Sequence, residues 1–177
     1  MGQDATDWAV AEFAGTPGLE SRLQDRLVQT AAALATRPAG SLPQRFDWKE
    51  LKGAYRLVHQ AAARPDTLQE VHRTRTRERV DAVSGPVLFI HDSTVLDFTR
   101  HAAVREQLGP IADAFSRGFI QHNSLAVDPT SGTLLGLIHQ QTFCRERQPE
   151  GETRAQRYYR VNRESSIWLE GVQVGGY

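Results

Sequence analysis

The chain has 177 residues, of which 40% are hydrophobic and 24% are charged, and its 21 basic side chains balance its 21 acidic ones. This composition excludes an intrinsically disordered or collagen-like chain, and the length predicts one ordinary domain or two small ones. Because the net charge is zero, attraction to nucleic acid would have to come from a local arrangement of cations.

No stretch approaches the roughly 20 apolar residues of a membrane-spanning helix, and the opening MGQDATDWAV has neither the basic leader nor the apolar core of a signal peptide. We therefore expect a cytoplasmic protein that does not contact a membrane. The single cysteine, Cys144, cannot form an internal disulfide, and no Cys-x-x-Cys or His-Glu-x-x-His spacing indicates a zinc site.

Residues 1–80 predict helices separated by turn signals. Apolar residues there recur every three or four positions, the spacing that lines them up on one face of a helix. Proline in the segment 37–40 ends the clearest of these helices, because proline has no N–H to donate. The expected helices cover residues 6–13, 19–34, 47–60 and 65–80.

The expected helix at 47–60 has the strongest start signal. Asp47 occupies the N-cap position and Glu50 follows three residues later, which is a variant of the capping box. The 3.6-residue period then separates an apolar face from a basic one. The expected buried face holds Leu51, Ala54, Tyr55 and Val58, and the opposite face holds Lys49, Lys52 and Arg56.

The pattern changes after Ser84-Gly85-Pro86, where short apolar runs replace the helical spacing. Two of these runs are joined by residues 128–132, a strong turn sequence. We expect an α+β fold, with an all-helical N-terminal domain over residues 1–83 and a three-strand antiparallel meander plus a helix over residues 84–177. The expected strands cover residues 87–90, 118–127 and 134–141, residues 144–163 form a loop or a solvated helix, and a last helix covers residues 164–169.

The sharpest chemical feature is Asp92, which follows the first apolar run directly. We expect its carboxylate at the carboxyl end of a buried strand, where it can reach solvent and a cation. An aspartate followed by Ser93 and Thr94 is also typical of a turn or a helix cap. Taken alone, the residue leaves both interpretations open.

Several short segments occur in a set order between residues 7 and 141. They are Asp7-Trp8-Ala9, Arg26-Leu27-Val28, Ser41-Leu42-Pro43-Gln44, Lys52-Gly53-Ala54-Tyr55-Arg56, Ile90-His91-Asp92-Ser93-Thr94-Val95-Leu96-Asp97-Phe98, Leu108-Gly109-Pro110, His122-Asn123-Ser124-Leu125-Ala126-Val127-Asp128 and Leu135-Gly136-Leu137-Ile138-His139-Gln140-Gln141. In composition and order they resemble the DDE transposases of the insertion-sequence-four (IS-four) family, in the branch of the transposase of bacterial transposon Tn-five. The likeness covers nearly the whole chain but only the first part of the family's polypeptide.

The resemblance implies a helical domain that binds the transposon end, followed by the first part of a catalytic domain of RNase H-like fold. In the family, two Asp and one Glu hold divalent metal ions, Mg²⁺ or Mn²⁺, and Asp92 matches the first of these three carboxylates. Two metal ions activate the attacking oxygen and stabilise the leaving one, which requires more than one carboxylate. The family also implies a homodimer on paired ends of double-stranded DNA.

The family's second aspartate and its glutamate lie further along than this sequence extends. Asp97, Asp113 and Asp128 are other carboxylates nearby, but Asp128 belongs to a turn and Asp97 to the segment that supplies Asp92. We do not expect these residues to replace the two missing ligands. The catalytic triad is therefore expected to be incomplete, and the chain alone to be inactive in DNA cleavage.

Cations in the helical region are candidates for DNA contact. Arginine suits both phosphate binding and paired hydrogen bonds to guanine. The alternative is that these cations form an ordinary solvated helix face. The candidate DNA-binding residues are Arg22, Arg26 and Arg56, which match basic positions of the family, and Arg45, Lys49 and Lys52, which come from the helix-face pattern.

Histidines and tryptophans are expected to have structural roles. His122 and His139 lie in strand-like runs, where we expect packed and hydrogen-bonded side chains and not metal ligands or general bases. Trp8, Trp48 and Trp168 are expected to pack in the core and not to stack on bases.

Two functions from different classes remain open. The first is transposon-end binding as the N-terminal part of a cut-and-paste DDE transposase that acts on the bacterial nucleoid. The second is a stand-alone DNA-binding regulator or relic that occupies transposon ends without cleavage.

Overall fold

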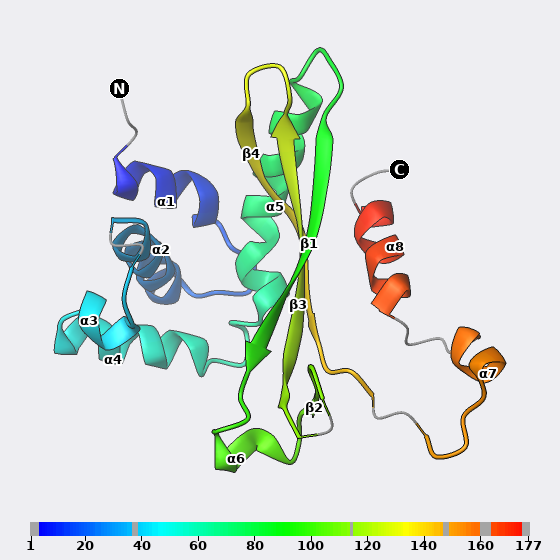
Figure 1. Ribbon diagram of the computed structural model, residues 1–177. Helices are drawn as coiled ribbons and strands as arrows, with labels where there is room; N and C mark the ends of the chain where they lie inside the picture. Colours follow the sequence, from blue (N-terminus) through cyan, green and yellow to red (C-terminus); the bar gives the residue numbers. More distant parts are fainter. Residues whose placement is uncertain (1–3, 37–38, 114, 147–148, 160–163, 175–177) are drawn as a thin grey trace. The chain divides into compact units, whose positions relative to one another are not determined.

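The computed structural model describes residues 4–36, 39–113, 115–146, 149–159 and 164–174. The chain forms two compact units, Met1–Glu78 and Arg79–Tyr177. In the described part of the chain, the first unit contains helices and the second is built on an antiparallel sheet (Figure 1). The predicted mixture of helices and antiparallel strands, with the helices leading, is confirmed.

The helices expected in the first eighty or so residues are all present, together with a short one that the sequence patterns did not predict. This extra helix, α3, begins with a capping box in which the side-chain oxygen of Gln44 accepts a hydrogen bond from the backbone N–H of Ser41. It is a single turn, too short for a periodic apolar pattern to develop. The helices are α1 (Ala5–Phe13), α2 (Ser21–Thr36), α3 (Leu42–Arg45), α4 (Trp48–Val58) and α5 (Pro65–Asp81).

Two apolar clusters form the core of the helical unit, and α4 contributes to both. Leu57 joins one cluster, and Leu51 and Ala54 join the other. Because these residues are three apart, they share one face of α4 and fix its rotation about its own axis. The other buried members are Leu19, Leu27 and Ala63 in the first cluster and Phe46 in the second.

The rotation of α4 differs from the sequence-based expectation. Tyr55 and Val58 were expected to be buried, but they are 44% and 59% exposed, whereas Leu57 is only 2% exposed. One residue along a helix corresponds to a turn of roughly 100°. The buried face centres on Ala54, so the side chains of Tyr55 and Val58, each one position past a buried residue, are turned toward solvent.

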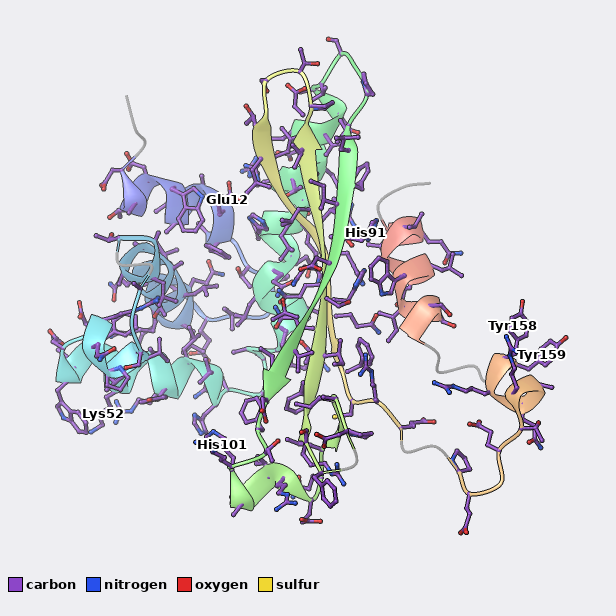
Figure 2. The ribbon with its side chains drawn as sticks, viewed as in Figure 1. Glu12, Lys52, His91, His101, Tyr158 and Tyr159 are labelled. Carbon is purple, nitrogen blue, oxygen red and sulfur yellow. The ribbon has the colours of Figure 1, made fainter. Side chains whose placement is uncertain are left out.

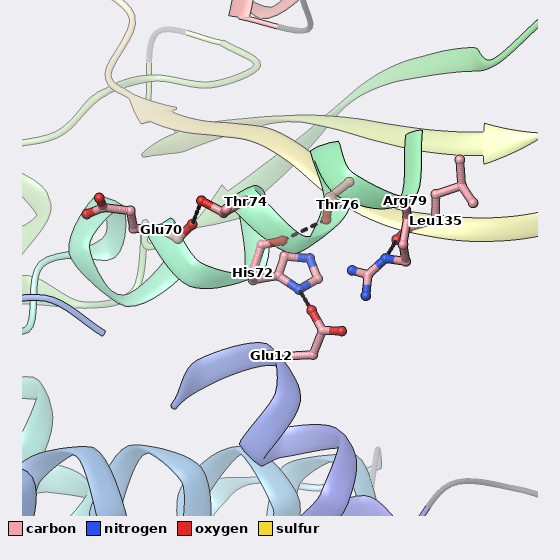
Figure 3. Close-up of polar contacts among 7 residues, drawn as sticks. All are labelled: Glu12, Glu70, His72, Thr74, Thr76, Arg79 and Leu135. Atoms are coloured by element: carbon pink, nitrogen blue, oxygen red, sulfur yellow. Dashed lines mark hydrogen bonds and ion pairs between the residues drawn. The ribbon is translucent and has the colours of Figure 1, made fainter. Parts of the chain in front are cut away.

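A buried polar contact joins α1 to α5 within the helical unit. The Glu12 carboxylate lies 2.6 Å from Nδ1 of His72, and Glu12 is almost completely buried (Figure 3). The His72 carbonyl accepts a hydrogen bond from the hydroxyl of Thr76, which is also buried. Polar groups at these depths require partners, because an unsatisfied buried group costs about 1–3 kcal/mol.

The second unit is organised around one long central strand, β3. Strand β1 pairs with it along one edge, and β4 and the short β2 pair with it along the opposite edge, all antiparallel. The three long strands are therefore consecutive neighbours, as the predicted meander requires. The strands are β1 (Leu88–Asp97), β2 (Gly109–Pro110), β3 (Arg117–Asp128) and β4 (Thr133–Phe143).

Strand β1 is longer than the sequence predicted. The apolar run stops at Ile90, but pairing with β3 continues to Asp97, which lies opposite Gly118. Residues 91–94 of β1 are polar and lie opposite polar residues of β3, so no apolar alternation marks the strand directly after Ile90. The register between β3 and β4 also shifts beside Gly136, whose φ of 148° favours glycine.

Helix α8 (Glu164–Val174) packs on one face of this sheet. It was expected to end near Leu169 because Gly171 breaks helical patterns, but the helix continues to Val174. A Cβ at Gly171 would lie 3.1 Å from the Ser124 hydroxyl and 3.4 Å from Nε2 of His122. Glycine at this position therefore permits close approach of the helix to the sheet.

Two short helices complete the described part of the second unit. Helix α6 (Ala102–Arg105) was not predicted, and α7 (Arg154–Tyr158) lies in the segment expected to be a loop or a solvated helix. Tyr158 and Tyr159 at the end of α7 are labelled in Figure 2 and are both exposed. Across the described ranges, every helix is too short or too polar to cross a membrane.

Candidate nucleic-acid interface

The start of α4 is fixed by reciprocal hydrogen bonds. The backbone N–H of Glu50 donates to the Asp47 carboxylate at 2.7 Å, and the backbone N–H of Asp47 donates to the Glu50 carboxylate at 3.0 Å. This is the predicted capping box, and it makes Trp48 the first residue of the helix. Together with the buried face, the cap determines which side chains α4 presents to solvent.

The solvent-facing side of α4 carries a mixed aromatic and basic row, which we call the α4 row: Trp48, Lys52, Tyr55, Arg56 and His59. These positions are spaced by four, three, one and three residues, so they lie on one side of the helix. The row lines a shallow groove of about 410 Å³, together with Gln60. Lys52 marks this helix in Figure 2.

The aromatic side chains of the α4 row are unusually exposed. Trp48 is 77% exposed and Tyr55 is nearly half exposed, whereas such large rings are normally packed. The prediction that Trp48 packs in the core is therefore wrong. Trp48 is exposed because α4 buries Leu51, Ala54 and Leu57 against α2 and α3, which leaves Trp48 on the solvent side of the helix.

The end of the α4 row is held by the helix backbone. The Nδ1–H of His59 donates to the carbonyl of Tyr55 at 2.7 Å, and the backbone N–H of His59 donates to the same carbonyl at 3.2 Å. The His59 ring is thereby oriented beside Tyr55, with its other ring nitrogen available to solvent-side partners. The row can thus offer cations, aromatic rings and an imidazole from a single rigid element.

Arg26 of α2 reaches the edge of the α4 row. A Cβ at Gly53 would lie 2.5 Å from Cζ of the Arg26 guanidinium, so this side chain rests directly on the α4 backbone. Gly53 is four residues after Lys49 and three before Arg56, and these three positions form one line along the helix. The Arg26 guanidinium therefore lies at the position between two cations of α4.

The other candidate cations are placed differently. Arg22 is exposed on α2, one turn before Arg26, and Lys49 is exposed on α4. Arg45 is partly buried at the end of α3. The structure thus groups Arg26 and the three cations of α4 along one side of that helix, while Arg22 and Arg45 come from neighbouring elements.

Residues 5–63 match the family of transposase DNA-binding domains. The matched segment runs from the start of α1 through α4, so it contains the α4 row and Arg26. This transposase DNA-binding domain identifies DNA as a partner of the chain. The matched residues comprise helices α1 to α4 and the segments that join them.

Asp92, the candidate catalytic residue, lies in the second unit. It is exposed in the middle of β1, directly opposite Asn123, and not at the carboxyl end of the strand as predicted. The correction follows from the continued pairing of β1 as far as Asp97. Asp92 is also not part of a turn or a helix cap, which was the other interpretation of this residue, because it lies within the paired part of β1.

The cross-strand row of Asp92 contains a single carboxylate, fewer than a two-metal site requires. The row continues through Asn123 to Gln140, so it offers one carboxylate and two carboxamides. The Asn123 oxygen already accepts hydrogen bonds from the amides of Gln140 and Gln121. Among the residues that the structure describes, no group of three His, Cys, Asp or Glu side chains could hold a metal ion.

Three other carboxylates of this unit stabilise turns. The backbone N–H of Thr99 donates to Asp97, and the N–H groups of Phe115 and Ser116 donate to Asp113. The Ser131 hydroxyl and the Thr130 N–H donate to Asp128, and these bonds hold the pKa of the Asp128 carboxyl below its ordinary value of 3.8. Each carboxylate is thus used locally.

A histidine cluster occupies the face of the sheet beneath α8. His122 is fully buried, and its Nδ1 lies 3.0 Å from the Ser93 hydroxyl. His91 stacks against it at a ring distance of 5.5 Å and lies 2.8 Å from the Ser124 hydroxyl. The expected packed and hydrogen-bonded role is confirmed for His122, and Trp168 covers its ring at 4.8 Å.

Proposed function

We propose that the helical unit binds the ends of a transposable element through the α4 row and Arg26. The match of residues 5–63 to transposase DNA-binding domains carries this proposal, because the same segment exposes cations and aromatic rings on one helix. Lys52 and Arg56 would contact phosphates, which supply most of the affinity for DNA. An exposed α-helix fits the major groove, where base edges can be distinguished.

We further propose that the complete activity is cut-and-paste transposition by a DDE transposase of the IS-four family, in the Tn-five transposase branch. The ordered segments that resemble this family support the assignment, and they extend into the sheet of the second unit. In this proposal the sheet is the first part of an RNase H-like domain, and the protein acts as a homodimer on the bacterial nucleoid.

Asp92 has a defined place in this second proposal. It would be the first of three carboxylates around Mg²⁺ or Mn²⁺, and its exposure on β1 leaves it accessible to a cation. The two further carboxylates are not among its described neighbours. DNA binding by the helical unit does not depend on this site.

A selection and competition experiment tests end binding. The 177-residue protein would be used to enrich duplexes from a random pool, and the recovered duplex would be compared with a scrambled duplex of equal composition in mobility-shift titrations at several salt concentrations. We expect the recovered duplex to bind more tightly at every salt concentration. Equal affinity for both duplexes throughout would reject specific recognition.

A further inference from the structure

The groove on α4 has walls of a particular chemistry. Trp48 opens the helix and Tyr55 follows two turns later, and the rings of both residues line the groove beside Lys52 and Arg56. The lining is almost entirely apolar, because the two cationic side chains contribute their aliphatic stems to it. The surface is therefore an apolar strip bordered by positive charge.

The bordering charges indicate what kind of molecule covers this strip. Cations of α4 and Arg26 lie along one side of it, which complements the phosphates that flank a DNA groove. Of the groups that base pairs present in the major groove, the C5-methyl group of thymine is the apolar one. An unstacked base would also fit aromatic walls, but unstacking costs a few kcal/mol that a methyl contact avoids.

We propose that Trp48 and Tyr55 recognise thymine in the major groove by packing against its 5-methyl group. The inference rests on the proposed DNA-binding function and adds the determinant of sequence preference. Lys52 and Arg56 hold α4 against the phosphates, and the two aromatic rings read the base edge. Trp48 is at the N-terminal end of α4, the end from which recognition helices often contact bases.

Deoxyuridine substitution tests this inference with a single-methyl change. In the duplex recovered by selection, each thymine would be replaced in turn by deoxyuridine, which keeps every hydrogen-bonding group. Dissociation constants would be measured for the full-length protein, for Trp48→Ala and for Trp48→Phe, with Arg77→Ala on α5 as the matched surface control. Because Trp48 is exposed, thermal unfolding of the variants should match that of the unchanged protein.

At one or two thymines, loss of the methyl should weaken binding by the unchanged protein about fourfold, the effect of one buried methyl group. Trp48→Ala should abolish this sensitivity, and Trp48→Phe and Arg77→Ala should retain it. An enriched duplex whose affinity is unaffected by deoxyuridine, or equally affected in Trp48→Ala, overturns the inference and leaves DNA binding intact.

Two other outcomes also count against the inference. If 2-aminopurine placed beside the critical thymine brightens on binding, and Trp48→Ala abolishes the brightening, the groove holds an unstacked base and not a methyl group. If selection enriches no sequence, the proposed end recognition fails together with the inference. The two failures are therefore distinguishable.

Discussion

The guanidinium of Arg26 lies against the backbone of Gly53, at a point where a Cβ would come within 2.5 Å of its Cζ atom. Both residues belong to the helical unit, and the contact brings α2 and α4 together beside the α4 row. Glycine at position 53 thus leaves room for the Arg26 side chain, and the backbone conformation does not require it. Gly53 lies within the helix and has no need of a left-handed geometry.

Gly53→Ala should separate stability from DNA binding. Alanine is favoured over glycine within a helix by up to about 1 kcal/mol, so unfolding should become slightly harder. The added methyl should displace Arg26, remove one phosphate contact and lower the salt slope of DNA binding by about 0.9. Salt titrations of Gly53→Ala, Arg26→Ala and the double variant check this. If Gly53→Ala acts by displacing Arg26, the double variant should have the same salt slope as Arg26→Ala. Two reductions of the slope that add up in the double variant would contradict this explanation.

Glu12→Gln should destabilise the helical unit. The substitution removes the negative charge from the buried contact with His72, and we expect the free energy of unfolding to fall by about 1–3 kcal/mol. Glu70→Gln on the exposed surface of α5 is the matched control and should change it by less than about 0.5 kcal/mol. Urea titrations followed by circular dichroism compare the two variants, and equal effects would show that the buried contact is not a determinant of stability.

Gly171→Leu should loosen α8 from the sheet. A side chain at this position meets Ser124 and His122, so the helix must move away even though leucine favours helical structure. Hydrogen exchange of the α8 amides should become faster, while DNA binding stays unchanged. Ser166→Leu adds the same side chain at an exposed position of α8. If both variants exchange alike, close packing at Gly171 is not what holds the helix.

Asp128 should make the sheet more stable above its ordinary pKa than below it. The Ser131 hydroxyl and then the Thr130 N–H lower the pKa of this carboxyl in the folded state, so the folded protein binds fewer protons than the unfolded one. The contribution is present above pH 3.8 and is lost as the pH falls through the lowered pKa. Thermal unfolding of Asp128→Asn should differ from that of the unchanged protein near pH 5 and converge toward it in stronger acid. A difference that is constant with pH would contradict this.

Sequence patterns predict the positions of helices and strands correctly where a capping or turn signal is strong. Asp47 and Glu50 located the start of α4, and the turn at residues 128–132 located the β3–β4 hairpin. The same patterns do not predict which face of a helix is buried, because that depends on packing against other helices. Tyr55 and Trp48 are exposed because Leu57 is the residue that fills the core, a choice that depends on α2 and is not encoded within α4.

The second half of β1 shows a different limit of sequence patterns. The first partly buried residues of β1 after Ile90 are His91 and Ser93, which lie opposite Ser124 and His122 of β3. A strand stabilised by polar side chains on its buried face lacks the alternation that predicts strands. For this reason Asp92 was placed at the end of a strand that continues well past it.

The salt dependence of DNA binding by Lys52→Ala/Arg56→Ala tests the central claim most directly. If these cations of α4 contact phosphates, the double variant should lower the slope of log affinity against log salt by about 1.8, or about 0.9 for each lost contact. Arg77→Ala on α5 should leave the slope unchanged. An unchanged slope in the double variant, or an equal change in Arg77→Ala, would show that the α4 row is not the DNA-binding surface.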